Sequence, residues 1–554
     1  MPRRLLPITL LLAGCAGAAG SPPATLVIHG PTWTGDPEHP TADAIAIAGD
    51  SIVFVGDSAG AAALVGPTTE VLHAGAGMVL PAFADGHVHL LDGGLQLASV
   101  DLRDAATPEE FIRRIAAFAR TQAPGEWILG GTWDHENWGG ELPTRAWIDS
   151  VTPEHPVFVQ RLDGHMALAN SRALALAGLD RSMAEVAGGT IVRDDNGELT
   201  GLLKDEAMGP VFAAIPAPSP AQADSGVAAA MRHANSKGLA AVSAVSAGLE
   251  VDATRRLRAA GRQTLRTAFY PPLAAWRGVA DRLAADGPGD DWIRLAGVKG
   301  FVDGSLGSTT ALFFDPYLDE PGSRGLMVTP EDSLRRWIGA ADSAGLQVVV
   351  HAIGDRANAL LVSIFDSIAT AHGPRDRRFR IEHAQHLRPE EIARLAPAGI
   401  LASMQPYHAA DDGRWAAKRI REPQLRGTYA FHSLLEAGAT VVFGSDWYVA
   451  PIDPLLGIWA AVTRQTLDGA HPDGWYPAER ISLDQALTAY TTANAAATFA
   501  EARRGMLRPG MLADVVILDR DLRTIAPDRI RDAAVRTTVV GGQVVFRAEA
   551  APAP

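Results

Sequence analysis

Short apolar runs rich in β-branched residues mark both ends of this 554-residue chain. Near the start they cover residues 25–28, 44–47 and 51–55, and Gly49-Asp50 between the last two is typical of a two-residue hairpin turn. Near the end, residues 513–518 and 538–546 have the same character. The segments 21–79 and 501–554 are therefore expected to be β-rich.

Between these ends, over residues 80–500, strand-like apolar runs alternate with helical stretches rich in Ala, Leu and Arg. The helical stretches include residues 108–121, 221–237, 330–344 and 389–396. Alternation of this kind predicts an α/β protein with a parallel barrel or an open sheet. Residues 127–216 are long for one β/α unit, so an insertion is expected there.

Polar residues that can bind a metal follow the ends of five apolar runs. They are His87 and His89, Lys299, His351, His383, and Asp446. Residues two apart in a strand face the same side, so the imidazoles of His87 and His89 can reach one ion. Active sites of parallel barrels form at the C-terminal ends of the strands. The pattern predicts a metal centre at that end.

Lys299 is one of only four lysines among the 49 basic residues, and it follows an apolar run where a solvated charge is unexpected. Its amine can react with CO2 to give a carbamate that bridges two cations. The alternative is a buried ion pair with Asp303. Among the other histidines, His386 is an alternative ligand to His383, which we prefer because it ends the strand. His408 is equally compatible with substrate contact and with structural hydrogen bonding.

The composition of the chain limits the classes of molecule that it is expected to bind. The chain has 63 acidic residues against 49 basic ones, a net charge of −14, which argues against binding the phosphates of nucleic acid. No polybasic membrane patch is visible. We expect a small-molecule substrate, and the sequence does not indicate an oligomeric state.

The first 20 residues read as an export signal. Two arginines precede an apolar stretch, residues 5–12, that is too short to cross a bilayer as a helix. Leu12-Ala-Gly-Cys15 resembles a bacterial lipobox, so we expect lipidation at Cys15 and an exported lipoprotein that faces the periplasm or the cell exterior. The alternatives are a plain cleaved signal ending near Ala19 or a wrongly assigned start. With one cysteine the chain has no internal disulfide.

Together these motifs resemble the amidohydrolase superfamily, in particular the amidohydrolase family 3 branch that includes N-substituted formamide deformylases. The resemblance spans residues 25–546. Its main motifs are Asp85-Gly-His-Val-His89, Gly130-Gly-Thr-Trp-Asp134, Asp163-Gly-His165, Val298-Lys-Gly-Phe-Val-Asp303, His351-Ala-Ile-Gly-Asp355, Ile381-Glu-His383 and Gly444-Ser-Asp446. Several motifs in order are far more specific than any one alone.

The resemblance implies a (β/α)8 barrel and a small β-sandwich built from both chain ends. It implies that His87, His89 and Asp446 hold one metal and that His351 and His383 hold another, with carbamylated Lys299 between them. We expect one or two ions of zinc, although manganese, iron and cobalt accept the same ligands. One departure is Ala82, where the family commonly has glycine.

The implied activity is hydrolysis of a C–N bond, in an amide, formamide or cyclic amide, by metal-activated hydroxide. Asp446 is the expected proton carrier. The predicted substrate contacts are His165, Arg161, Asp134 and Trp133, although for an aromatic residue such as Trp133 simple packing is the more frequent role. The alternatives are hydrolysis of an ester or an N-acyl amino acid, or a binding lipoprotein that has lost catalysis.

Overall fold

A computed structural model of the chain describes residues 23–245 and 248–549. The predicted signal of residues 1–20 and Cys15 lie outside the described residues. No helix within the described residues is long and apolar enough to span a bilayer.

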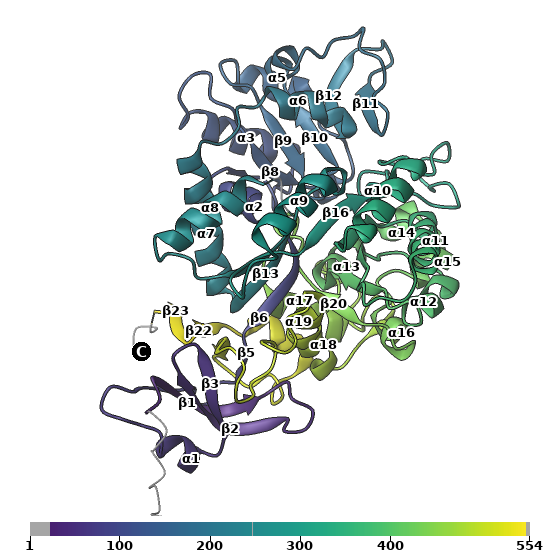
Figure 1. Cartoon of the computed structure of the whole chain (residues 1–554). Coiled ribbons are helices and arrows are strands. Elements are labelled where there is room, and N and C mark those ends of the chain that lie inside the picture. The colour runs from purple at the N-terminus through teal and green to yellow at the C-terminus, as the bar shows by residue number, and fades with distance from the viewer. Residues whose placement is uncertain (1–22, 246–247, 550–554) are drawn as a thin grey trace, which may run out of the picture.

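Parallel strands form the centre of the molecule, in two sheets (Figure 1). The first contains β6 (Phe83–Val88), β13 (Leu239–Val245), β14 (Arg266–Tyr270) and β15 (Ile293–Leu295). The second contains β16 (Gly297–Phe301), β17 (Gln347–Ala352), β18 (Arg380–His383), β19 (Leu401–Met404) and β20 (Val441–Phe443). Parallel bridges connect Val88 to Trp447 and Pro272 to Lys299, so the first sheet meets the second beyond β6 and again just after β14. The predicted α/β class is confirmed.

Helices cover these strands on the outside. They include α2 (Leu90–Gln96), α7 (Pro220–Ser236), α8 (Leu249–Ala259), α9 (Trp276–Asp286), α10 (Glu331–Ser343), α11 (Asp355–His372), α12 (Pro389–Leu395), α16 (Phe431–Glu436), α17 (Pro454–Thr463), α18 (Leu483–Tyr490) and α19 (Thr492–Ala497). In α10, Leu334, Ile338 and Ala341 repeat at helical spacing and are buried. Strand β17 is buried along its whole length, as expected for a parallel strand covered on both faces.

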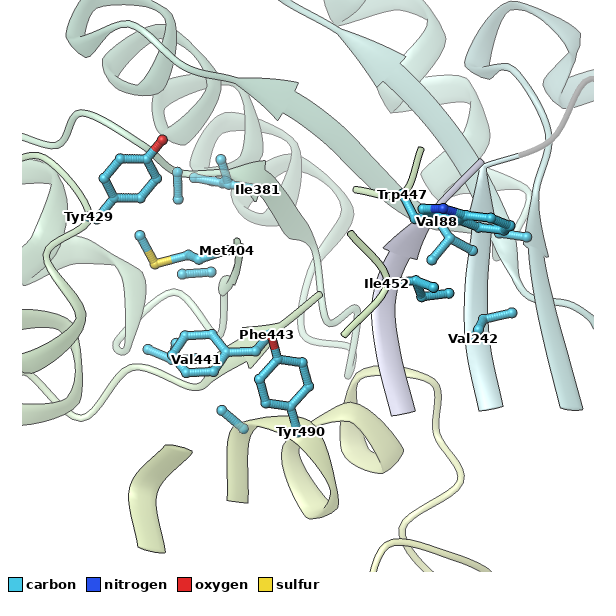
Figure 2. Packing of buried hydrophobic residues seen from close by; sticks show 14 of the residues in the cluster. Val88, Val242, Ile381, Met404, Tyr429, Val441, Phe443, Trp447, Ile452 and Tyr490 are labelled. Atoms are coloured by element: carbon cyan, nitrogen blue, oxygen red, sulfur yellow. The ribbon is translucent and has the colours of Figure 1, made fainter. Parts of the chain in front are cut away.

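The core continues from the strands into the C-terminal helices. Figure 2 shows Phe443 of β20 beside Tyr490 of α18, and their ring centroids are 5.5 Å apart. Asn494 of α19 donates a hydrogen bond of 2.8 Å to the carbonyl of Phe443. These contacts fix the end of β20, from which Asp446 follows.

Strands from both chain ends combine in one eight-stranded sheet. Its strands are β1 (Leu26–Trp33), β2 (Thr41–Ala48), β3 (Ser51–Gly56), β4 (Glu70–His73), β5 (Val79–Pro81), β21 (Val515–Leu518), β22 (Val535–Val540) and β23 (Gln543–Arg547). Strand β5 pairs with β1 on one side and with β21 on the other, which joins the two ends. The expectation that both ends are β-rich is confirmed.

A third sheet forms the insertion, at the top of Figure 1. It contains β7 (Val100–Asp101), β8 (Gly130–Trp133), β9 (Phe158–Arg161), β10 (Met166–Ala169), β11 (Gly189–Arg193) and β12 (Leu199–Asp205). It therefore starts upstream of the expected residue 127. Helix α3 (Pro108–Ala119) packs into the core of this insertion through Phe111 and Ile115. Its apolar spacing is that of any covering helix, so the sequence pattern did not separate it from the helices that cover the two parallel sheets.

Candidate metal centre

His87, His89 and Asp446 come together where β6 and β20 end. His87 lies in β6, His89 follows it, and Asp446 comes three residues after β20. The Asp446 N–H donates to the His87 carbonyl (2.8 Å) and the His89 N–H donates to the Trp447 carbonyl (2.6 Å). Asp446 has a φ of +60°, which few residues other than glycine adopt. The two strand ends thus hold a strained carboxylate beside two imidazoles.

The separations among these side chains suit a metal ion. Asp446 Oδ1 lies 3.4 Å from His87 Nε2 and 3.2 Å from His89 Nε2. Oδ1 is buried and accepts no hydrogen bond from the described residues. Ligand atoms about 2.1 Å from a tetrahedral zinc ion stand about 3.4 Å from one another. The three atoms therefore fit the ligand set that the sequence predicted for the first ion.

Lys299 of β16 reaches the same place. Its Nζ atom lies 3.4 Å from His87 Nε2 and 4.4 Å from the centre of the Phe301 ring. Burial lowers the pKa of Lys299 to about 8, which leaves an appreciable fraction of reactive neutral amine at neutral pH.

Asp303 does not pair with Lys299 among the described residues. Its carboxylate accepts three backbone N–H groups, from Leu312, Ile353 and Gly354, at 2.7–3.0 Å. One of its oxygens lies 3.6 Å from His351 Nε2. The alternative of a buried Lys299–Asp303 ion pair is therefore wrong, and Asp303 instead holds the loop after β16 to the end of β17.

A second group of potential ligands shares Asp446. His383, His408 and Asp446 each present an atom within 4.8 Å of the others. His408, in α13 (Pro406–Asp412), has a buried Nε2 atom with no hydrogen-bond partner in the described residues. The sequence interpretation missed this histidine as a ligand, and its only signal was its position just after β19.

His351 lies against this group without entering it. Its ring centroid is 4.5 Å from that of His383, and its Nε2–H donates to the Gly304 carbonyl at 3.0 Å, which leaves Nδ1 free. The alternative ligand His386 is turned away, because its two nitrogens bond to Gln385 and Thr428. Its position supports the preference for His383.

Neighbouring polar groups orient the histidines. Glu382 accepts from His87 Nδ1 at 2.5 Å, from Ser403 at 2.9 Å, and from Arg380. The Gln405 amide oxygen accepts from His383 Nδ1 at 2.8 Å. Partners of this kind fix the tautomer so that the other ring nitrogen can face a metal. The sequence interpretation did not identify Glu382 or Gln405 in this role.

The protonation states match what metal ligands require. Burial lowers the pKa of His87 to about 4, and it lowers the pKa of His351 and His383 well below the usual value. Burial would raise the pKa of Asp446, but His87, His89 and His383 outweigh it and hold that pKa well below its usual value. At neutral pH His87, His351 and His383 are therefore neutral imidazoles and Asp446 is an ionised carboxylate.

Two of the four predicted substrate contacts line the pocket beside this centre. Arg161 and His165 line a narrow pocket together with His351, His383 and Asp446. His165 Nδ1–H donates to Asp205 at 2.6 Å, which leaves Nε2 available to a substrate. Both residues come from the insertion.

The other two predicted contacts, Trp133 and Asp134, do not line this pocket. Trp133 is fully buried in the core of the insertion, and its Nε1–H donates to the Val159 carbonyl at 2.9 Å. Asp134 is also buried and pairs with Arg161 Nη2 at 2.8 Å. The predicted substrate contacts for Trp133 and Asp134 are therefore corrected: Trp133 packs, and Asp134 positions Arg161.

Comparison with known proteins identifies the family. Residues 70–546 match the family model described as "Amidohydrolase family". The chain belongs to this family. The chain is 39% identical to the protein LONG AFTER FAR-RED 3 of Arabidopsis thaliana, over 94% of this chain and 91% of that protein. It is 27% identical to the N-substituted formamide deformylase of Arthrobacter pascens, over 93% of this chain and 97% of that enzyme.

Solved structures agree with this assignment. An uncharacterized metal-dependent hydrolase from Pyrococcus horikoshii matches with a TM-score of 0.73 and 28% identity, over 91% of this chain and 99% of that chain. The amidohydrolase resemblance read from the sequence motifs is therefore confirmed, and the protein is a metal-dependent hydrolase of this family.

Proposed function

We propose that the protein is a zinc-dependent hydrolase that cleaves a C–N bond, in an amide, formamide or cyclic amide, of a small molecule. One observation carries this proposal. The Nε2 atoms of His87 and His89 converge on Asp446 Oδ1, which accepts no hydrogen bond from the described residues. We further propose that the two parallel sheets form one (β/α)8 barrel and that the terminal strands form a β-sandwich.

His87, His89 and Asp446 would hold the first ion, and His383 with His351 or His408 would hold a second. Lys299, as a carbamate, would stand between them. When bound, zinc supplies Lewis acidity and lowers the pKa of a water ligand toward neutrality.

Asp446 is the group placed to move the proton. It is ionised, buried, and part of the pocket wall together with His351 and His383. It can accept a proton from the attacking water and deliver it to the leaving nitrogen. A neutral leaving amine needs this proton, because an amide anion leaves poorly.

Residues of the insertion orient the substrate. Asp205 fixes the tautomer of His165, whose ring centroid lies 5.0 Å from that of His351. The Arg161 guanidinium is held by Asp134 and by Asp163 (2.8 and 2.7 Å) and lines the same pocket. These groups are rigid before substrate arrives, which favours a single bound geometry.

Metal analysis tests the proposal. Protein lacking residues 1–20 is purified, reconstituted with zinc and measured by elemental analysis, alongside hydrolysis of a panel of amides, formamides, cyclic amides and esters. We expect bound zinc, turnover of the C–N substrates, and loss of both on dialysis against a chelator. His89→Ala should lower zinc content, whereas His73→Ala, an exposed histidine of β4, should not. A protein that binds no metal, or that cleaves only esters, contradicts the proposal.

A further inference from the structure

Two cavities of very different size open onto the candidate metal centre. The narrow pocket, lined by His351, His383 and Asp446, has a volume of about 40 Å³. The second cavity, which we name the chamber, is lined by His89 and Lys299 and has a volume of about 590 Å³. Because both cavities include residues of the centre, a substrate bound there can extend into each.

The narrow pocket is too small for a bulky group. A water molecule needs roughly 10–15 Å³ of such space, so about 40 Å³ holds roughly three water-sized groups. Its walls carry charged side chains, among them Arg161, Asp163 and Asp411. The narrow pocket can therefore hold a small end of the substrate, such as a formyl or an acetyl group.

The chamber has the size and surface of a site for a larger apolar group. Its volume falls within the range of about 300–1,000 Å³ that is typical of small-molecule pockets. Its apolar walls are formed by Val245, Tyr270, Leu273, Phe301, Val328 and Trp337. Ala187 and Glu206 of the insertion complete it, so the insertion contributes to both cavities.

Acidic side chains determine which charge the chamber accepts. Asp92 and Glu206 line it, and neither forms an ion pair or a side-chain hydrogen bond within the described residues. Both side chains are exposed, so each is accessible to a group bound in the chamber. A substrate carboxylate in the chamber would meet these two acidic groups, and Lys299, the basic side chain that the described residues place in its wall, would add no positive charge as a carbamate.

We propose that the scissile bond of the substrate joins a small group, held in the narrow pocket, to a bulky apolar group without negative charge, held in the chamber. This inference rests on the proposed hydrolase function and specifies its substrate class. The geometry does not depend on whether the bulky group is on the acyl or the amine side, so the test examines each side.

The first experiment varies the two sides of the substrate separately. One series is formamides with N-methyl, N-butyl and N-cyclohexylmethyl groups; the other is N-methyl amides with acetyl, pentanoyl and cyclohexylacetyl groups. We expect kcat/KM to rise at least about tenfold along one series, since one methylene in an apolar pocket is worth roughly 10–200-fold. Amides that are bulky on both sides should be poor substrates. Flat profiles in both series, or good turnover of doubly bulky amides, would overturn the inference.

Filling the chamber is the second experiment. Ala274→Trp and Ala187→Trp each place a large side chain on its wall. The ratio of kcat/KM for the bulky substrate to that for the N-methyl substrate should fall at least tenfold in each variant. Ala275→Trp and Ala184→Trp are matched controls, because both alanines are exposed and neither lines the chamber, and they should keep the wild-type ratio. An unchanged ratio in both chamber variants would contradict the inference.

The third experiment tests the effect of negative charge on the bulky group. A carboxylate at the far end of the bulky group should lower kcat/KM at least about tenfold relative to a methyl group at that position. Glu206→Gln should reduce this penalty several-fold, whereas Glu198→Gln, an insertion glutamate paired with Arg181, should leave it unchanged. A penalty that is absent in the wild type would contradict the charge preference.

A binding measurement separates this inference from the proposed function. Cyclohexylmethanol cannot be hydrolysed, and its binding to the zinc-loaded protein is measured by calorimetry. Binding to the wild type and to Ala275→Trp, with at least tenfold weaker binding to Ala274→Trp, supports the chamber even if no amide is turned over. Turnover of small amides without any binding of cyclohexylmethanol overturns the inference and leaves the hydrolase proposal standing.

Discussion

The two ends of the parallel strands bury charged groups in opposite ways. At the carboxyl ends, Asp446 Oδ1 is buried beside His87 and His89 and accepts no hydrogen bond from the part of the chain that the structure describes. At the amino end of β14, Arg266 is equally buried, but its Nε and Nη2 atoms bond to the two oxygens of Asp514 at 2.8 and 3.0 Å. The Gly541 N–H adds a further bond to Asp514 at 2.9 Å.

This difference in bonding distinguishes a buried charge that serves function from a buried ion pair that serves stability. A charge that is fully paired within the chain leaves nothing for a ligand to bind, and removing one partner strands the other. A buried carboxylate with an unbonded oxygen is costly unless something else completes it. Burial is common to both ends of the parallel strands, so the incomplete bonding is what marks the carboxyl end as the site.

The largest expected effect comes from changing Asp446. Asp446→Asn keeps the shape but removes the proton carrier, so we expect kcat to fall by about 10²–10⁴-fold. Because the neighbouring histidines hold the pKa of Asp446 well below its usual value, the ionised carboxylate contributes stability at neutral pH, so the unfolding temperature should fall modestly and by less than in Arg266→Met, described next. Kinetics on the metal-loaded variant and a thermal melt check both. Full activity would reassign the proton carrier, and a strongly lowered melting temperature would contradict the contrast between the two ends.

Breaking the pair at the other end should have the opposite outcome. Arg266→Met leaves Asp514 buried and unpaired, and we expect a loss of about 3–5 kcal/mol in the free energy of unfolding. The kcat of the folded, zinc-loaded fraction should not change. Chemical denaturation and activity of the same samples provide the measurements. The double variant Arg266→Met/Asp514→Leu should recover part of the stability, and failure to recover would indicate lost packing on Trp292, whose ring Arg266 covers at 4.3 Å.

Sequence reasoning predicted the residues that follow strand ends. His87 and His89 were identified because alternate residues of a strand share a face, and β6 indeed runs to Val88. His351 and Lys299 were identified because each ends an apolar run, and they lie in β17 and β16. A strand and its end are local properties, so a short stretch of sequence suffices to indicate them.

Contacts that depend on the path after the strand were not predicted. His408 reaches the centre from a helix that begins after β19, and nothing in the local sequence indicates where that helix leads. Trp133 and Asp134 were predicted to contact substrate, yet Trp133, the last residue of β8, packs into the core of the insertion and Asp134 pairs with Arg161. Long-range packing decides such positions, and one sequence does not encode it visibly.

Glu382 sharpens the comparison, because it is a buried carboxylate at the carboxyl end that is fully bonded. Glu382→Gln removes the charge that orients His87, and we expect zinc affinity to weaken by about 10–100-fold. Competition with a fluorescent chelator measures this. Glu391→Gln is the matched control, since Glu391 is also buried and paired, with Arg388, but lies in α12 away from the centre. Equal zinc affinity in both variants would mean that Glu382 serves stability alone, as Asp514 does.

The smallest effect is expected where the same kind of ion pair lies at the surface. Arg547 and Glu70 connect β23 with β4 at 2.7 Å, a distance like that of Arg266 and Asp514, but both side chains are about half exposed. Water solvates either partner when the other is removed, and salt screens their attraction. Arg547→Gln should therefore change the free energy of unfolding by less than about 1 kcal/mol, and the difference should shrink as salt is raised in the same denaturation experiment used for Arg266→Met. A loss as large as that of Arg266→Met would show that the geometry of the pair, rather than its burial, determines the energy, and the contrast between the two ends of the parallel strands would then need another cause.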